Sequence, residues 1–198
     1  VFRFRAERDK ARAWKAEGSR MFIDPKTPVS VQELLHGMIT QSGNDASITL
    51  AEGVAGSEEA FADMMNKRAQ ALGLKNSHFK NATGLPHAEH YSTAMDIGRL
   101  AAALIREFPD RYPLYAVKEY RYNNITQLNR NRLLWIDPSV DGVKTGHTEN
   151  AGYCLVASAK RGDRRLLSVV LGTASESARA VESQKLINHG FQAYDTRR

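Results

Sequence analysis

Cysteine and long apolar runs are scarce in this sequence, and each scarcity excludes a class of structure. Cys154 is the one cysteine among 198 residues, so no disulfide can form within the chain. It lies in an apolar run, residues 153–157, where we expect a packing role. No run approaches the roughly eighteen apolar residues of a membrane-spanning helix. Residues 1–12 also lack the apolar core of a secretion signal.

The charge is positive but unevenly spread. Residues 1–12 hold five basic and two acidic side chains, which is half of the net charge of +6. No concentrated basic stripe follows, so the sequence does not predict a nucleic-acid partner. We expect residues 1–12 to be an unrelated basic tail. Residues 13–198 should form one domain, because this length suits a single buried core.

Hydroxyl side chains mark three helix starts in the first half of the chain. Ser30, Ser57 and Thr93 each precede an apolar stripe at helical spacing, and Glu33 completes a capping box with Ser30. A shorter helix is expected after Asn44. The positions expected on the buried faces are Val31, Leu34, Leu35, Met38 and Ile39; Phe61, Met64, Met65, Ala69 and Leu72; and Ile97, Leu100, Ala101, Leu104, Ile105 and Phe108.

The second half changes to strand-like patterns. Residues 152–159 and 164–171 are rich in Val, Leu and Tyr, and the polar residues 160–163 between them predict a hairpin. A last amphipathic helix is expected over residues 176–194. This order predicts an α+β fold, in which a helical layer packs on an antiparallel sheet.

Two short motifs carry the candidate chemistry. A Ser-Gly-Asn motif, residues 42–44, falls where the first helix ends, and a Lys-Thr-Gly-His motif, residues 144–147, comes just before the first strand of the hairpin. Each motif alone is typical of a surface turn. In this order and about a hundred residues apart, they match two of the three motifs of penicillin-binding proteins and β-lactamases.

Further segments make the likeness specific. The sequence resembles the low-molecular-mass, serine-type D-alanyl-D-alanine carboxypeptidases, which are penicillin-binding proteins, from about residue 13 to about residue 194. The segments that carry the resemblance are Gln41–Ala46, Ala71–Leu74, Thr83–Leu85, Ser92–Asp96, Gln127–Asn131 and Val140–Thr148. It implies the serine β-lactamase/penicillin-binding-protein-like transpeptidase fold, an antiparallel sheet with a helical cluster. Class A β-lactamases share that fold but need a glutamate-containing deacylation loop, for which we find no convincing segment.

The resemblance implies acyl transfer through a serine ester. The family's nucleophile lies in a Ser-x-x-Lys motif at a helix start, well before Ser-x-Asn, whereas only 41 residues precede Ser42 here. The one literal match, Ser77–Lys80, lies downstream in a stretch that looks extended, and we expect no catalytic role for it. The nucleophile motif, the first strands, the secretion signal, the C-terminal β-domain and the membrane anchor are therefore expected outside this sequence.

Roles for four side chains follow from the resemblance. Ser42 Oγ would pass a proton to the departing D-alanine nitrogen. Asn44 would hydrogen-bond the amide of the substrate. Lys144 would supply positive potential and support the proton path, and the Thr145 hydroxyl would bind the terminal carboxylate.

Three further residues complete the implied site. Gly146 would leave room for the peptide to lie beside the strand edge. The backbone N–H of His147 would form half of the oxyanion hole. Arg179 would lie near the carboxylate pocket, or would form a helix-surface salt bridge instead. Residues 129–131 are expected to brace the Lys-Thr-Gly strand.

The implied substrate is a peptidoglycan stem peptide that ends in D-Ala-D-Ala, and the implied compartment is the periplasm. β-Lactams would bind the full-length form, and any membrane association would come from segments outside this sequence. We expect no cofactor and no metal, since His87 and His90 have no third ligand beside them. The alternative is a catalytically inactive remnant or a weak peptidoglycan-binding module.

Overall fold

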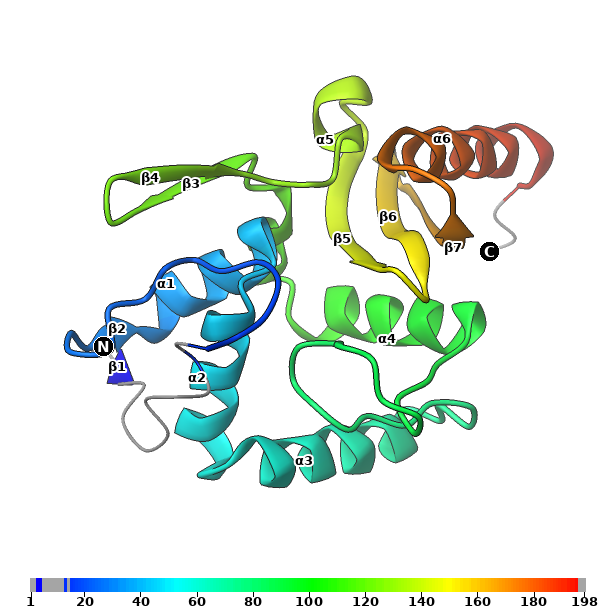
Figure 1. Cartoon of the computed structure of the whole chain (residues 1–198). Coiled ribbons are helices and arrows are strands. Elements are labelled where there is room, and N and C mark those ends of the chain that lie inside the picture. The colour runs from blue at the N-terminus through cyan, green and yellow to red at the C-terminus, as the bar shows by residue number, and fades with distance from the viewer. Residues whose placement is uncertain (1–2, 5–12, 14, 196–198) are drawn as a thin grey trace. The chain divides into compact units, whose positions relative to one another are not determined.

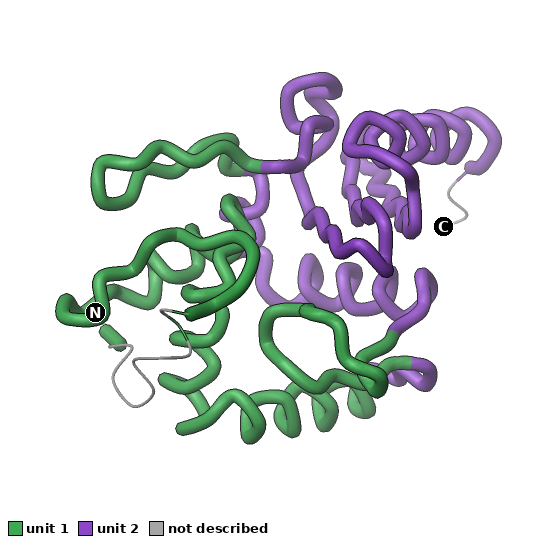
Figure 2. Tube along the Cα trace, viewed as in Figure 1, with its two compact units in different colours: residues 1–71, 77–91, 117–129 green, residues 72–76, 92–116, 130–198 purple. Residues whose placement is uncertain are grey.

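The computed structural model describes residues 3–4, 13 and 15–195 (Figure 1). The chain forms two compact units (Figure 2). The first comprises residues 1–71, 77–91 and 117–129, and the second comprises residues 72–76, 92–116 and 130–198. Most of the expected basic tail lies outside the described residues. Within it, strand β1 (Arg3–Phe4) pairs antiparallel with β2 (Val29–Ser30).

Helices are the main secondary structure described in the first unit. They are α1 (Val31–His36), the π-helix η1 (Gly37–Gln41), α2 (Asn44–Ala55) and α3 (Glu58–Ala71). The capping box that the sequence predicts is confirmed, because Ser30 Oγ accepts the Glu33 N–H while the Glu33 carboxylate accepts the Ser30 N–H. Ser57 Oγ likewise accepts the Ala60 N–H at 3.1 Å.

The core of the first unit lies beneath α1 and α2. Its buried members are Met21, Ile23, Val29, Leu34, Ala46 and Leu50. Phe4 packs against this cluster and lies over Gly53 of α2, where a Cβ would overlap the phenyl ring. Glycine therefore opens the surface of α2 to an aromatic side chain from a distant segment.

Two predicted core positions are wrong. Met64 is 47% exposed, because α3 buries Ala62 and Ala69, and a residue two positions after Ala62 points to the far side of a helix. Phe108 is 51% exposed, because it is the C-cap residue of α4 (Ala94–Glu107) and leaves the helical stripe there.

The first unit also contains a hairpin that the sequence patterns did not predict. Strand β3 (Glu119–Tyr122) pairs with β4 (Ile125–Leu128), and the two turn residues between them have positive φ angles of 47° and 60°. Two left-handed asparagines are typical of a tight type I′ turn. The hairpin packs against η1, and the Tyr120 ring stacks on His36 with centroids 4.5 Å apart.

The second unit is built around an antiparallel sheet of order β5-β6-β7, formed by β5 (Val140–Thr148), β6 (Gly152–Arg161) and β7 (Arg164–Thr173). The predicted β6–β7 hairpin and the helix after it, α6 (Glu176–Ala193), are confirmed. The other elements are α4, the 3-10 helix η2 (Tyr112–Ala116) and the short helix α5 (Leu133–Ile136).

The two faces of this sheet are covered by different helices, as the alternating side chains of β6 show. Leu155 and Ala157 cluster with Ile187 of α6, whereas Val156 clusters with Ala101 of α4. Neighbouring side chains on a strand point to opposite faces, so α6 and α4 cover opposite sides. Both faces are therefore apolar, as the β-rich pattern of this region requires. Among the described residues, no helix is both long and apolar enough to cross a membrane.

Candidate active site

The Ser-Gly-Asn motif joins the π-helix to α2 in the first unit. Ser42 ends η1 with φ 64° and ψ 37°, and its N–H donates to the Gly37 carbonyl. The Gly43 N–H donates to the same carbonyl at 3.0 Å. A serine in the left-handed region is strained. Single π-helical turns are also frequent at functional sites. The predicted helix-ending turn is thus confirmed, with an unpredicted π-helix before it.

Asn44 begins α2 and is held by the segment that precedes β2. Its backbone N–H donates to the Ser19 carbonyl at 2.8 Å, and its side-chain Nδ2 donates to the Glu17 carbonyl at 2.6 Å. The residue is 9% exposed. The carboxamide therefore has a fixed orientation in the first unit.

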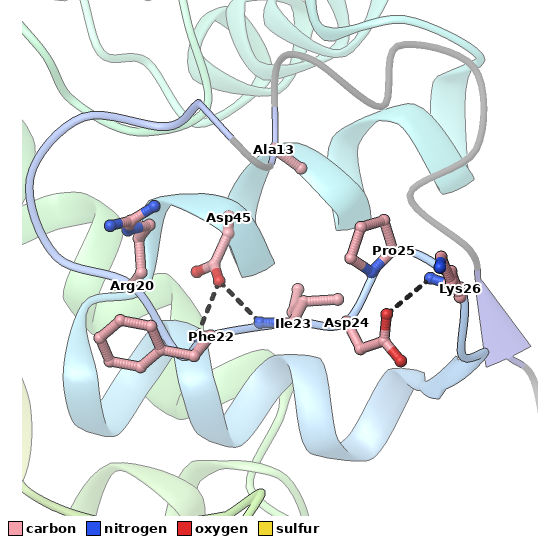
Figure 3. A pocket seen from close by; sticks show the side chains of 8 residues that line it. All are labelled: Ala13, Arg20, Phe22, Ile23, Asp24, Pro25, Lys26 and Asp45. Atoms are coloured by element: carbon pink, nitrogen blue, oxygen red, sulfur yellow. Dashed lines mark hydrogen bonds between the residues drawn. The ribbon is translucent and has the colours of Figure 1, made fainter.

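Asp45 is a residue of this region that sequence reasoning left without a role. Its carboxylate accepts the backbone N–H groups of residues 21–23, of which Figure 3 shows those of Phe22 and Ile23. It also borders an open pocket of about 750 Å³. The pocket is lined by Ala13, Arg20, Phe22, Ile23, Asp24, Pro25, Lys26 and Asp45. The sequence offered one signal for this role: Asp45 is an acidic residue in the first turn of a helix, directly after the motif.

The Lys-Thr-Gly-His motif lies within β5, in the second unit, and directly precedes β6, the first strand of the predicted hairpin. Residues 144–147 pair in register with residues 156–153 of β6. Gly146 faces Cys154 on that strand, and Cys154 is half-buried. In the described part of the sheet β5 pairs with β6 alone, so it is an edge strand there. The edge position suits the predicted pairing with an extended peptide.

Lys144 is half-buried among other cations. Its Nζ donates to the Thr145 carbonyl at 3.0 Å. Burial, with Arg130 and Arg179 nearby, lowers the pKa of Lys144 to about 7. A lysine with that pKa exchanges its proton readily near neutral pH, which suits a side chain expected to support proton transfer.

Arg179 reaches the back of the motif from α6. It is 3% exposed, and its guanidinium donates to the Gly146 carbonyl at 3.3 Å and to the Arg130 carbonyl at 3.5 Å. It also pairs with Glu176 at 3.4 Å, one helical turn away. The salt bridge of the second alternative is therefore present, but the guanidinium is buried behind β5. Its proposed role near a carboxylate stays a prediction.

Tyr153 is a second residue that the sequence did not single out. Its ring lies against His147, with centroids 4.0 Å apart, and the Arg179 guanidinium lies 5.5 Å from the Tyr153 ring centroid. The ring of Tyr153 thus links the exposed His147 side chain to the buried arginine.

The expected brace of the Lys-Thr-Gly strand is confirmed at Asn131. Its Nδ2 donates to the Gly142 carbonyl at 3.0 Å, and its Oδ1 accepts the Leu133 N–H. Asn129 differs, since it belongs to the first unit and donates to the Val117 carbonyl. Gly142 itself needs to lack a side chain, because a Cβ would lie 2.6 Å from the Tyr112 hydroxyl.

The downstream Ser-x-x-Lys match does not begin a helix. His78 forms an isolated bridge with Tyr91, and Lys80 pairs with Glu89 at 3.4 Å. This extended geometry supports the prediction that the Ser77 hydroxyl is not a nucleophile. Within the described residues, no group of three or more His, Cys, Asp or Glu side chains could hold a metal ion.

Comparison with known families places most of the chain in one of them. The D-alanyl-D-alanine carboxypeptidase family, peptidase S11, matches residues 6–175. The D-alanyl-D-alanine carboxypeptidase DacA of Escherichia coli K12 is 48% identical over 179 residues, which cover 90% of this chain and 44% of that protein. DacC of the same organism is 50% identical and is 45% covered. The chain thus spans less than half the length of these two relatives.

Solved structures show the same likeness. Penicillin-binding protein 5 of Haemophilus influenzae matches with a TM-score of 0.87 and 46% identity, over 90% of this chain and 52% of that one. The carboxypeptidase DacD of Francisella tularensis matches with a TM-score of 0.91 and 35% identity, over 98% of this chain and 59% of that one. Penicillin-binding protein D2 of Listeria monocytogenes, solved with cefotaxime bound, is 31% identical with a TM-score of 0.81, over 89% of this chain and 72% of that one.

Proposed function

Since the chain belongs to the D-alanyl-D-alanine carboxypeptidase family, we propose that it supplies the substrate-binding and proton-transfer groups of a serine carboxypeptidase. Its substrate would be a peptidoglycan stem peptide ending in D-Ala-D-Ala, cleaved in the periplasm. β-Lactams would react with the same site once the nucleophile is present. The observation that carries the proposal is the Lys-Thr-Gly-His run on the edge strand β5.

The chemistry of β5 fits a peptide with a free carboxylate. The edge strand offers backbone groups for pairing with an extended substrate, and Gly146 leaves space beside it. Thr145 contributes a hydroxyl donor, and Lys144 contributes a cation whose lowered pKa allows proton exchange. The His147 N–H would meet the oxyanion that develops at the attacked carbonyl.

Ser42 and Asn44 would serve the leaving group and the peptide amide. Ser42 Oγ would pass the proton to the departing nitrogen, and the Asn44 carboxamide would hydrogen-bond the substrate amide. The strained backbone of Ser42 and the fixed carboxamide of Asn44 support these roles, because catalytic groups need a defined geometry. The nucleophile would come from a Ser-x-x-Lys segment encoded upstream.

Labelling with a fluorescent penicillin tests the proposal. The 198-residue chain should form no covalent adduct, whereas a longer protein that carries an upstream Ser-x-x-Lys segment should be labelled stoichiometrically. The longer protein should also release D-alanine from a D-Ala-D-Ala peptide. A longer protein that does neither would support the inactive remnant instead. Labelling of the short chain that is lost on mutating Ser77 would place the nucleophile downstream.

A further inference from the structure

The carboxylate of Asp45 has an unusual number of backbone partners. It accepts N–H groups from Met21 at 2.9 Å and from the next residue of its own helix at 3.0 Å. It also accepts those of Phe22 at 2.9 Å and Ile23 at 3.1 Å, which Figure 3 shows. Asp45 is 3% exposed and directly follows Asn44. Three consecutive N–H groups of one segment therefore converge on one buried side chain.

This arrangement requires a group that only accepts hydrogen bonds. Both carboxylate oxygens are used, and each receives two N–H groups. A carboxamide of the same shape would direct its own N–H₂ group at backbone donors. Hydrogen bonds to an ionised acceptor are also shorter and stronger than neutral ones. Asp45 thus fastens residues 21–23 to the first turn of α2.

The same segment holds the neighbouring Asn44. The Glu17 carbonyl accepts the Asn44 side chain and the Ser19 carbonyl accepts its backbone N–H. The chain bends sharply on either side of Ser19, because Gly18 and Phe22 both have left-handed φ angles, of 76° and 67°. A segment with such bends keeps its path only where contacts at both ends fix it.

We infer that Asp45 is a positioning residue, which anchors residues 21–23 and thereby sets the Glu17 carbonyl that orients the Asn44 carboxamide. Asp45 acts through Asn44 and does not itself touch the substrate. The catalytic consequence rests on the proposed function, in which Asn44 binds the substrate amide. The anchoring itself does not depend on that function, so the two can be tested separately.

The anchoring is tested in the 198-residue chain by amide hydrogen exchange. Asp45→Asn should speed exchange at Met21, Phe22 and Ile23, because one acceptor oxygen is lost and N–H donors then face each other. Asp24→Asn is the matched control. Asp24 lies on the same segment and borders the same pocket, but it accepts bonds from Lys26 and Thr27. Unchanged exchange at residues 21–23 in Asp45→Asn would overturn the inference.

A measurement on the unmodified chain covers the case in which the variant does not fold. The Asn44 side-chain amide proton bound to the Glu17 carbonyl should exchange slowly with solvent, as followed by NMR. Residues 21–23 should be protected in the same sample. Rapid solvent exchange of that Asn44 proton, or unprotected amides at residues 21–23, would contradict the inference without any substitution.

The catalytic consequence is tested in the longer protein through release of D-alanine. Asp45→Asn should lower kcat/KM by about tenfold to a hundredfold, as misplacement of a positioned group does. In an Asn44→Ala background the same change should cost no more than about twofold, because its target is already gone. Full additivity would show a merely structural role and overturn the inference. An inactive wild-type protein would instead overturn the proposed function, while the exchange result still decides the anchoring.

Discussion

At the scale of single residues, replacing Lys144 should lower catalytic efficiency strongly. In the longer protein, Lys144→Ala would remove positive charge that, in the proposed mechanism, acts on the substrate and the proton path together. We expect a loss of about 3 kcal/mol in transition-state stabilisation, roughly a hundredfold in kcat/KM. His147→Ala should cost less, because the backbone N–H survives the change. The measurement is D-alanine release from a D-Ala-D-Ala peptide.

Together, the two variants distinguish a site that uses Lys144 and the His147 backbone N–H from one that uses the His147 imidazole. Near-normal efficiency in Lys144→Ala with no activity in His147→Ala would contradict the assignment. The His147 imidazole, which lies against Tyr153, would then have to be the acid–base group.

Lys144 should also make the stability of the short chain depend on pH. Its pKa falls from an ordinary 10.5 to about 7 in the folded chain, so between these values the unfolded chain binds more protons. The contribution of Lys144 to the free energy of unfolding therefore rises with pH across this window. Below about pH 7 the lysine is charged in both states, and the full destabilisation by the buried charge is present. Lys144→Met should gain most stability in acid and little above pH 10.5. Urea unfolding of both proteins across this range checks the difference, and a pH-independent difference would contradict it.

At the scale of elements, the segment of residues 77–91 should loosen in acid. His90 Nδ1 accepts the Lys80 N–H, so the His90 ring must be unprotonated at that nitrogen. Burial, with His78 and His87 nearby, lowers the pKa of His90 below its ordinary 6.5. As the pH falls below 6.5, His90 is protonated more readily in the opened segment than in the closed one. The closed segment therefore becomes less stable in acid.

Amide exchange at Lys80 and Glu89 measures this loosening. It should accelerate as the pH falls below 6.5, relative to the intrinsic rate at each pH. Substituting His90 by Gln should weaken the acid response. The amides of β6, which lie in the other unit, serve as an internal control. Equal acceleration in both regions would indicate general unfolding instead.

Elements with a strong local signal were predictable from the sequence. Ser30 and Thr93 each begin a helix because a hydroxyl side chain satisfies an otherwise unpaired N–H, and that requirement is local. The β6–β7 hairpin follows from two β-rich runs around a glycine turn. Strands β3 and β4 escaped prediction because each has four residues and is stabilised by packing on η1.

The site shows the same division. Residues 42–44 and 144–147 were recognisable because their chemistry lies in short contiguous motifs. The roles of Asp45 and Tyr153 depend on partners far along the chain or across a strand pair. No periodicity or cap reports such contacts. The π-helix before Ser42 was likewise not predicted, because π-helices are rare and its apolar positions continue the stripe of an ordinary helix.

For the whole molecule, the β7 edge of the second-unit sheet should govern self-association. In the described part of the chain β7 pairs with β6 alone, and Leu171 on β7 is 48% exposed. An exposed apolar edge strand is a template for pairing with another copy. We expect the isolated chain to associate with rising concentration, and Leu171→Lys to raise the monomer fraction without lowering Tm.

Light scattering coupled to size-exclusion chromatography measures that fraction. Val181→Lys is the matched control, because Val181 is equally exposed at 48% but lies on α6. If both substitutions suppress association equally, added charge and not edge pairing is responsible. If neither does, the edge of β7 is not the contact.

Ser42 has a consequence for how this sequence can change over time. It holds a left-handed backbone that glycine adopts freely, at a cost of roughly 1 kcal/mol for any other residue. Ser42→Gly should therefore relieve strain and raise Tm while removing the hydroxyl expected to protonate the leaving group. A laboratory selection for heat resistance alone would favour that glycine. Only selection for turnover would keep the serine, so this position records which of the two pressures a lineage has been under.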